Sequence, residues 1–490
     1  MKPVWIAVVA ITAAYAVVAW SGVEQWKDSG GDDSFAYRDY VERVYRTHEL
    51  PPRSENYEFS LPPGAPYLGV AVTWAFAPIR ADRPSPPLQG LPRLLRRLLW
   101  LALIVGGGAL LLGSRRWQPR WLLGVAAWFA AAGWAWTYLN AAVDNERWLP
   151  LVLVSYTAAV ALVPATALLA REVWPERRSA PVLGAAAAAL MPIVLMSTLY
   201  FHPDPPFALL AVLAVVTVVR ALRTGLTVRA GVATGILLGA AALTRQSAPI
   251  VAVSLALAVA LIARRQSLRF LIAGACALLV TAGPWWVIQT VRFGNPLQSN
   301  LSRPGQMLDH EPASFFVSFP TQLVTRPYAP AFQNELLPRF HAYLWSDWGG
   351  QYHHWGETKR YATQLASVQS VLGFGGDALV LGGLLLLGAP ALVRVARGGA
   401  GGATDAALAT LTTVFVVSWL AFVATLVRFP QRGGDPIKGH YLLFLAPVSA
   451  AFAIAAGYSL VRRGGWPRLL LLAWTAAYAI SWALTVATAF

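Results

Sequence analysis

The chain has 490 residues, of which 57% are hydrophobic and only 13% are charged, and its mean hydropathy is +0.51. Soluble domains carry about 25% charged residues, so this composition excludes a soluble globular protein and predicts a chain that crosses a membrane many times. The formal net charge of +16 would suit a nucleic-acid partner. The basic residues lie in connectors between the apolar segments, however, and the topology of a membrane protein explains this excess of positive charge, as shown below.

The first predicted element is an apolar run over 4–20, which is just long enough to span a bilayer. A cleaved signal peptide is the alternative. Because no small-residue cleavage site followed by a soluble domain is evident, we expect a retained first span. A polar loop follows over 21–94, and its densest acidic stretch begins at Asp32 and Asp33.

Within this loop, aromatic residues and valines recur at helical spacing over 34–47 and predict an amphipathic helix, which Pro51 and Pro52 would stop. A second apolar stretch over 67–79 is short for a crossing. We expect it to lie at the membrane interface, so that the whole loop stays on one side.

Twelve further apolar runs of spanning or near-spanning length bring the predicted transmembrane helices to about thirteen. They lie at 95–113, 119–140, 149–170, 181–200, 206–222, 230–244, 248–263, 268–290, 372–393, 406–427, 441–461 and 469–488. The sequence thus predicts an all-α polytopic membrane protein with long extracytoplasmic loops. We divide it into a transmembrane module over 1–290, a long loop over 291–371 and C-terminal helices over 372–490. A connection of that length is expected to be functional or to hold short helices of its own.

The connectors between the predicted spans alternate in charge. With Lys2, one set holds 18 Lys or Arg residues and only three acids, whereas the rest of the chain holds 21 basic and 20 acidic residues. The members of this set are at 114–120, 171–178, 220–229, 263–269, 394–405 and 461–468. Such a split follows the positive-inside rule, so we expect a cytoplasmic N-terminus, an extracytoplasmic C-terminus and no nucleic-acid partner.

Asp32 and Asp33 come directly before the predicted helix over 34–47. Either residue could cap that helix, because Asp stabilises helix N-termini, but two consecutive Asp are more than a cap requires. The alternative is a general base. A carboxylate beside a low-dielectric membrane surface can have a raised pKa and can accept a proton from a hydroxyl.

The turn HPDPP over 202–206 places Asp204 between two predicted spans, and its prolines would fix the position of the carboxylate. Asp204 either caps the following helix or holds an acceptor, and it could pair with His202. Arg245 follows an all-apolar helix, where a charge is costly unless it snorkels to water or finds a partner. The functional alternative to snorkelling is a counter-charge for a lipid phosphate.

The turn over 428–441 is cationic. It carries Arg428, Arg432, Lys438 and His440 against a single acid, and its two glycines and one proline indicate a tight turn. A cationic turn on the predicted outer side departs from the positive-inside rule, and a phosphate-binding site is its natural use.

Aromatic residues crowd the long loop in the stretch YLWSDWGGQYHHWGE over 343–357. Trp345, Trp348 and Trp355 could stack on sugar rings, or they could rest on lipid as an interfacial belt. His353 and His354 could hold a divalent metal, but adjacent histidines do not easily share one ion and no third ligand has suitable spacing. We therefore predict no cofactor, with a metal at these histidines as the alternative.

Several stretches resemble the GT-C superfamily of membrane glycosyltransferases, specifically bacterial relatives of the protein O-mannosyltransferases and aminoarabinose transferases. Those proteins carry an Asp-Glu or Asp-Asp pair in the first outer loop, followed by an amphipathic helix. The stretches here are DDSFAYRDYVERVYRTHELPP, LPPGAPYLGVAVTW, HPDPPFALLAVLAV, GILLGAAALTRQ, FGNPL and KGHYLLFLAP. Their order along nearly the whole chain is the specific part of the resemblance.

The resemblance implies an inverting sugar transfer from a polyprenyl-phosphate donor to a hydroxyl of a glycan, lipid or protein acceptor, at the outer face of the bacterial cytoplasmic membrane. One residue of the Asp32 and Asp33 pair would be the general base, and the spacing leaves both open. Asp204 would help to hold the acceptor. The donor phosphate would be bound by Arg245, Lys438 and His440, and the cationic turn described above adds Arg432 to this set. Further substrate contacts would come from Tyr37, His202, Trp345, Trp348 and Trp355.

A secondary transporter or lipid flippase is the alternative function, and a non-catalytic scaffold is a third. Transporters place polar groups at the middle of the membrane and often show paired repeats with broken helices. Here the centres of the predicted spans are almost free of charge and the acids gather in the predicted outer loops. This distribution favours the enzyme.

Overall fold

The structure of the chain is a computed structural model that describes residues 2–25, 34–53, 56, 58–80, 149–298, 310–328, 332, 335–347, 360–398, 402–430 and 439–489. Every regular element in these ranges is a helix, and they contain no strand. The predicted all-α polytopic fold is therefore confirmed.

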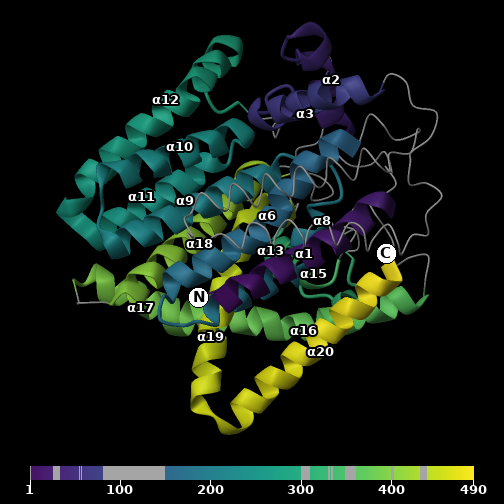
Figure 1. Cartoon of the computed structure of the whole chain (residues 1–490), viewed down its shortest axis with the longest axis vertical. Coiled ribbons are helices and arrows are strands. Elements are labelled where there is room, and N and C mark those ends of the chain that lie inside the picture. The colour runs from purple at the N-terminus through teal and green to yellow at the C-terminus, as the bar shows by residue number, and fades with distance from the viewer. Residues whose placement is uncertain are drawn as a thin grey trace.

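The helices pack into one bundle (Figure 1). The longer ones are α1 (Lys2–Gln25), α6 (Leu149–Val173), α9 (Asp204–Thr224), α12 (Leu268–Phe293), α16 (Arg360–Gly383), α18 (Ala403–Arg428), α19 (Ala446–Arg463) and α20 (Gly465–Ala489). The shorter ones are α2 (Ser34–Thr47), α3 (Gly64–Arg80), α7 (Ala180–Ala189), α8 (Pro192–Met196), α10 (Val228–Thr244), α11 (Ala248–Ala263), α13 (Ala313–Val317), α14 (Gln322–Thr325), α15 (Leu336–Trp345) and α17 (Ala389–Ala396). Other helical turns are η2 (Arg264–Ser267), the π-helical η5 (Leu384–Gly388) and η7 (Gly439–Leu445).

Eight helical segments of the described ranges are long and apolar enough to cross a membrane. They are Pro3–Val23, Leu151–Val173, Asp204–Thr224, Ala248–Phe293, Gln364–Ala396, Ala403–Arg428, Tyr441–Arg463 and Gly465–Ala487. The fourth of them contains two predicted spans, because α11 and α12 are joined through η2. The predicted spans over 95–113 and 119–140 lie outside the described residues.

One predicted span is broken. Residues 181–200 were expected to cross as a single helix, but they fold as α7 followed by the short α8. Pro192 has no backbone N–H to continue the hydrogen-bond ladder, and the residue before it, Met191, takes an extended conformation (φ −84°, ψ 118°). The prediction of one continuous span at this place is therefore wrong.

The amphipathic helix predicted over 34–47 is confirmed as α2, with the same bounds. It ends before the predicted stop at Pro51 and Pro52, because His48 adopts a left-handed conformation (φ 59°) that turns the chain out of the helix. The predicted short helices of the long loop also occur in its described parts, as α13, α14 and α15. The next helix, α16, begins at Arg360, within the segment assigned to that loop.

The basic connectors of the described residues meet at one end of the bundle, which we call the basic end. Side-chain contacts join them to one another and to the start of α1: Arg171 with Trp5, Arg223 with Glu172, Thr404 with Val173, Arg264 with Ala396 and Arg177 with Tyr458. None of these contacts was used in the charge argument, so the sorting of connectors to one side has independent support.

Helix α9 links this end to the opposite one. It runs for 21 residues from Asp204 to Thr224, which is about 30 Å at 1.5 Å per residue. Asp204 is thus one membrane thickness away from Arg223 at the basic end.

Candidate functional site

A buried carboxylate marks the end of the bundle opposite the basic end. Asp204 occupies the first turn of α9, and its side chain is 0% exposed. Its Oδ1 lies 3.0 Å from Nε of Arg245, and its Oδ2 contacts Nδ1 of His202. A buried charge persists only with such partners, and the opposite charge here is that of Arg245. The predicted pairing of Asp204 with His202 is present.

Arg245 turns inward. It caps the C-terminus of α10 in an extended conformation, and its guanidinium lies 4.6 Å from the centre of the Tyr441 ring. Burial alone would lower the pKa of Arg245. Nearby groups outweigh this effect and raise the pKa above its ordinary value; the largest contribution comes from Asp204, followed by Tyr37, Tyr441 and Glu58. Arg245 is therefore a fixed cation that faces Asp204, and it does not snorkel to water.

The His202 ring is held by aromatic neighbours. The ring centre of Tyr37, on α2, lies 5.0 Å away, and that of Tyr200 lies 5.6 Å away, both edge-on. The backbone of His202 is fixed as well, because its N–H and its carbonyl both bond to the hydroxyl of Ser155 on α6. Tyr37 and His202, two predicted substrate contacts, thus lie together, and both are buried.

Side chains of neighbouring elements hold the first loop beside this cluster by donating hydrogen bonds to its carbonyls. The carbonyl of Ser60 accepts from the amides of Gln246 (2.7 Å) and Gln289 (2.9 Å), which belong to the α10–α11 turn and to α12. The Tyr40 hydroxyl on α2 donates to the carbonyl of Leu61 (3.2 Å). Because side chains from three elements hold this short segment, the loop is placed beside Arg245.

A cavity of about 150 Å³ opens at this place. Its polar lining includes Glu58, Arg245 and Tyr441, and its apolar lining includes Phe422 and Phe444. It therefore offers a carboxylate, a cation and an aromatic ring beside an apolar wall. Such a surface suits a ligand that has an anionic or polyhydroxy head and an apolar tail.

Two residues of this cavity were not singled out from the sequence. Glu58 is 7% exposed and contributes to the charge balance of Arg245, but in the sequence it was one of several acids in a polar loop. Tyr441 follows His440 in the stretch KGHYLLFLAP and lies under the Arg245 guanidinium. Both residues of this contact belong to motifs that the sequence analysis had noted, Arg245 to GILLGAAALTRQ and Tyr441 to KGHYLLFLAP. Membership of these motifs was the signal that could have identified Tyr441.

Several predicted site residues lie outside the described part of the chain. They are Asp32, Asp33, Arg432, Lys438, Trp348 and Trp355, together with the side chain of His440. Their neighbours in sequence are placed, however. The helix that follows the Asp pair, α2, places Tyr37 against His202, and Tyr441, the residue after His440, has its ring under the Arg245 guanidinium.

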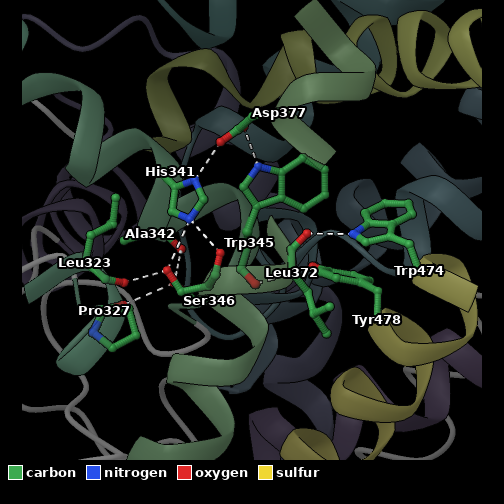
Figure 2. Close-up of polar contacts among 11 residues, drawn as sticks. Leu323, Pro327, His341, Ala342, Trp345, Ser346, Leu372, Asp377, Trp474 and Tyr478 are labelled. Atoms are coloured by element: carbon green, nitrogen blue, oxygen red, sulfur yellow. Dashed lines mark hydrogen bonds and ion pairs between the residues drawn. The ribbon is translucent and has the colours of Figure 1, made fainter. Parts of the chain in front are cut away.

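Trp345 lies in a different cluster (Figure 2). It is the last residue of α15, and it is 5% exposed. Its indole N–H donates to Oδ1 of Asp377 (2.6 Å), and its ring meets Tyr478 edge-on at 5.7 Å. A Cβ at Gly376 would come within 2.4 Å of the indole, so α16 passes directly against the ring. In this arrangement Trp345 connects α15, α16 and α20, and its sugar-stacking role stays a prediction.

The same cluster contains a serine, a histidine and an aspartate, the residue types of a hydrolase triad, but their hydrogen bonds differ from those of a triad. Nδ1 of His341 lies 2.6 Å from Oδ2 of Asp377, and Nε2 lies 3.1 Å from the Ser370 hydroxyl. Nε2 also lies 3.0 Å from the Ser370 carbonyl, which can only accept, and the Ser370 hydroxyl donates to Leu323. In a nucleophilic triad the serine proton is directed at the histidine ring, whereas here it is directed at the Leu323 carbonyl.

No group of three or more His, Cys, Asp or Glu side chains that could hold a metal ion occurs among the residues that the structure describes. His353 and His354 lie outside them, so the predicted lack of a metal stays a prediction.

Comparison with known proteins gives one structural match. No protein-family model and no curated protein matches the sequence. Among solved structures, the chain is similar to the crystal structure of ArnT from Cupriavidus metallidurans bound to undecaprenyl phosphate, with 15% sequence identity and a TM-score of 0.34. The match covers 92% of this chain and 78% of that chain.

Proposed function

We propose that the chain is a membrane glycosyltransferase that moves a sugar from a polyprenyl-phosphate donor to an acceptor hydroxyl, with inversion, at the extracytoplasmic face of the bacterial cytoplasmic membrane. The observation that carries this proposal is the meeting of three segments around Arg245. Three segments that are far apart in sequence meet there: the HPDPP turn supplies Asp204, Tyr441 of the KGHYLLFLAP segment lies under the guanidinium, and Glu58 of the first loop lines the same cavity as Arg245.

The chemistry of the proposed transfer requires charges of both signs. The departing lipid phosphate gains negative charge in the transition state, and fixed cations in a partly dry site stabilise it. Arg245 is such a cation, and the turn with Arg432, Lys438 and His440 would supply the others. The acceptor hydroxyl loses a proton as it attacks, and Asp32 or Asp33 would take it as general base.

Asp204 would act indirectly. Its side chain is fully buried and is engaged by Arg245 and His202, so contact with an acceptor is less well supported than a positioning role. In that role it holds the guanidinium toward the cavity and the imidazole toward Tyr37.

The acceptor and the donor sugar are left open by this proposal, and one experiment addresses both. Purified full-length protein in nanodiscs is incubated with a panel of polyprenyl-phosphate sugars and a native membrane extract as the source of acceptor. Consumption of one donor, with release of polyprenyl phosphate, is the expected result. Translocation of a donor across proteoliposomes without its consumption would instead support the transporter or flippase.

The general base is tested by substitution. Asp32→Asn, Asp33→Asn and the double variant are compared with Asp39→Asn, which removes a carboxylate that is 57% exposed on α2. We expect the double variant and one single variant to lose about 100-fold or more in turnover, as for removal of a general base, and the Asp39 variant to keep its activity. Wild-type turnover in the double variant would refute the assignment.

A further inference from the structure

A second cavity lies at the basic end, about one membrane thickness from the candidate site. Its volume is about 830 Å³. It is bounded by the turn after α6, the start of α18 and the last turns of α19. Neither the proposed sugar transfer nor the structural match assigns a role to it.

The rim of this cavity is cationic. Four arginines line it, namely Arg177, Arg394, Arg462 and Arg463, against two acids, Glu176 and Asp405. Asp405 is engaged by Arg394 at 2.8 Å. Arg462 and Arg463 form the last turn of α19 and are exposed, and no ion pair to either occurs within the described ranges. The pair is thus available to an anion from outside the chain.

The inner wall is apolar and has the character of a membrane interface. Leu387, Leu408 and Ala455 line its depth. Trp174 and Tyr458 pack edge-on at 5.7 Å beside the arginines, and Arg177 lies 5.5 Å from the Tyr458 ring. Trp and Tyr concentrate at the level of lipid head groups, which places the rim of the cavity at the depth where lipid phosphates lie.

One element of the lining also carries lipid-facing side chains. The π-helical η5 lies between α16 and α17 and supplies Leu387 to the cavity, and its residues Leu385 and Leu386 are 61% and 71% exposed. Exposed leucines in a membrane span face hydrocarbon. A ligand in this cavity could therefore keep an apolar tail in the bilayer while its head meets the arginines.

We propose that this cavity binds the phosphate head group of an anionic phospholipid from the leaflet at the basic end, with Arg462 and Arg463 as the phosphate ligands. Arginine presents two parallel N–H donors to phosphate oxygens, and basic pockets between transmembrane helices are suited to anionic lipid head groups. A soluble phosphate ester shares the head-group chemistry, but it would make no use of the apolar wall.

Native mass spectrometry of the full-length protein in detergent tests this proposal. Wild-type protein is titrated with phosphatidylglycerol, with zwitterionic phosphatidylcholine and with glycerol phosphate as a soluble competitor. We expect selective retention of phosphatidylglycerol and affinity about tenfold or more weaker in Arg462→Gln/Arg463→Gln, since each arginine near a lipid phosphate contributes on the order of 1 kcal/mol.

The matched control is Arg265→Gln, which removes the same charge at the same end from an exposed position that does not line the cavity. Equal weakening by this control, or an unchanged affinity in the double variant, would overturn the proposal. Displacement of the lipid by glycerol phosphate at similar concentration would reassign the cavity to a soluble phosphate ester. If the double variant does not fold, as judged by its elution from a sizing column, the two single variants carry the same comparison.

Discussion

At the scale of single residues, the ion pair between Asp204 and Arg245 is the contact with the largest energetic consequences. An exposed ion pair contributes little to stability, but here the carboxylate is fully buried and the guanidinium is 15% exposed. Both ions have lost most of their hydration, so each depends on the other. The pair is therefore a structural requirement as well as a candidate part of the site.

Arg245→Gln removes the guanidinium that balances the buried Asp204 carboxylate. Breaking a buried pair in this way typically costs about 3–5 kcal/mol, so we expect a clear fall in the melting temperature of the purified protein. Adding Asp204→Asn should recover part of the loss, because the uncompensated charge is then gone. Exposed Arg229→Gln is the control and should leave the melting temperature unchanged. Losses that simply add in the double variant would contradict a coupled pair.

Trp345 gives a second residue-scale prediction, which separates packing from sugar stacking. Trp345→Phe keeps an aromatic face but removes the donor to the Asp377 carboxylate, and a hydrogen bond to a charged group contributes about 1.5–3 kcal/mol. We expect lower thermal stability with an unchanged KM for the sugar donor. Trp474→Phe, which loses a bond to the neutral carbonyl of Leu372, should cost less. A raised KM for the donor without loss of stability would favour stacking on substrate.

At the scale of elements, the local sequence pattern predicted the positions of most helices, because short-range interactions determine where a helix begins and ends. The bounds of α2 were predicted from its apolar spacing, and most spans were predicted from length and hydropathy. The break at Pro192 was also a local feature, but the apolar run over 181–200 outweighed it in the prediction. What the pattern could not predict is which helices cross closely, because such crossings depend on residues far apart in the chain.

Gly383 is a case of this kind. A Cβ at Gly383 would lie 2.1 Å from the carbonyl oxygen of Phe452, so α16 and α19 touch through their backbones there, whereas a Cβ at the neighbouring Gly382 meets nothing within 4 Å. Alanine favours a helix over glycine by about 1 kcal/mol. We therefore expect Gly382→Ala to be neutral or stabilising and Gly383→Ala to lower the melting temperature. Equal effects of the two substitutions would show that the close crossing is not essential.

At the scale of the whole molecule, the two ends of the bundle differ in charge and in chemistry. Six short segments and the N-terminus were sorted to one side by counting charges, and side-chain contacts bring the described ones together. The candidate site and the part of the first loop that is bonded beside it lie toward the other end. The sequence could predict this sorting because charge bias acts on each connector separately. It could not predict that Arg245 finds Asp204, since that contact depends on how α9 and α10 pack.

The orientation of these two ends in the membrane is the last prediction. Glu49 follows α2 in the first loop and Arg265 lies in η2 at the basic end, and both side chains are exposed. In a background with Cys276→Ser, we expect a membrane-impermeant maleimide to label Glu49→Cys in intact spheroplasts, because we propose that this end faces outward. Arg265→Cys should be labelled only after lysis, since positive connectors stay in the cytoplasm. The reversed pattern would move the candidate site to the cytoplasmic face and contradict transfer from an extracytoplasmic donor. Equal labelling of both positions before lysis would contradict the separation of the two ends by a membrane.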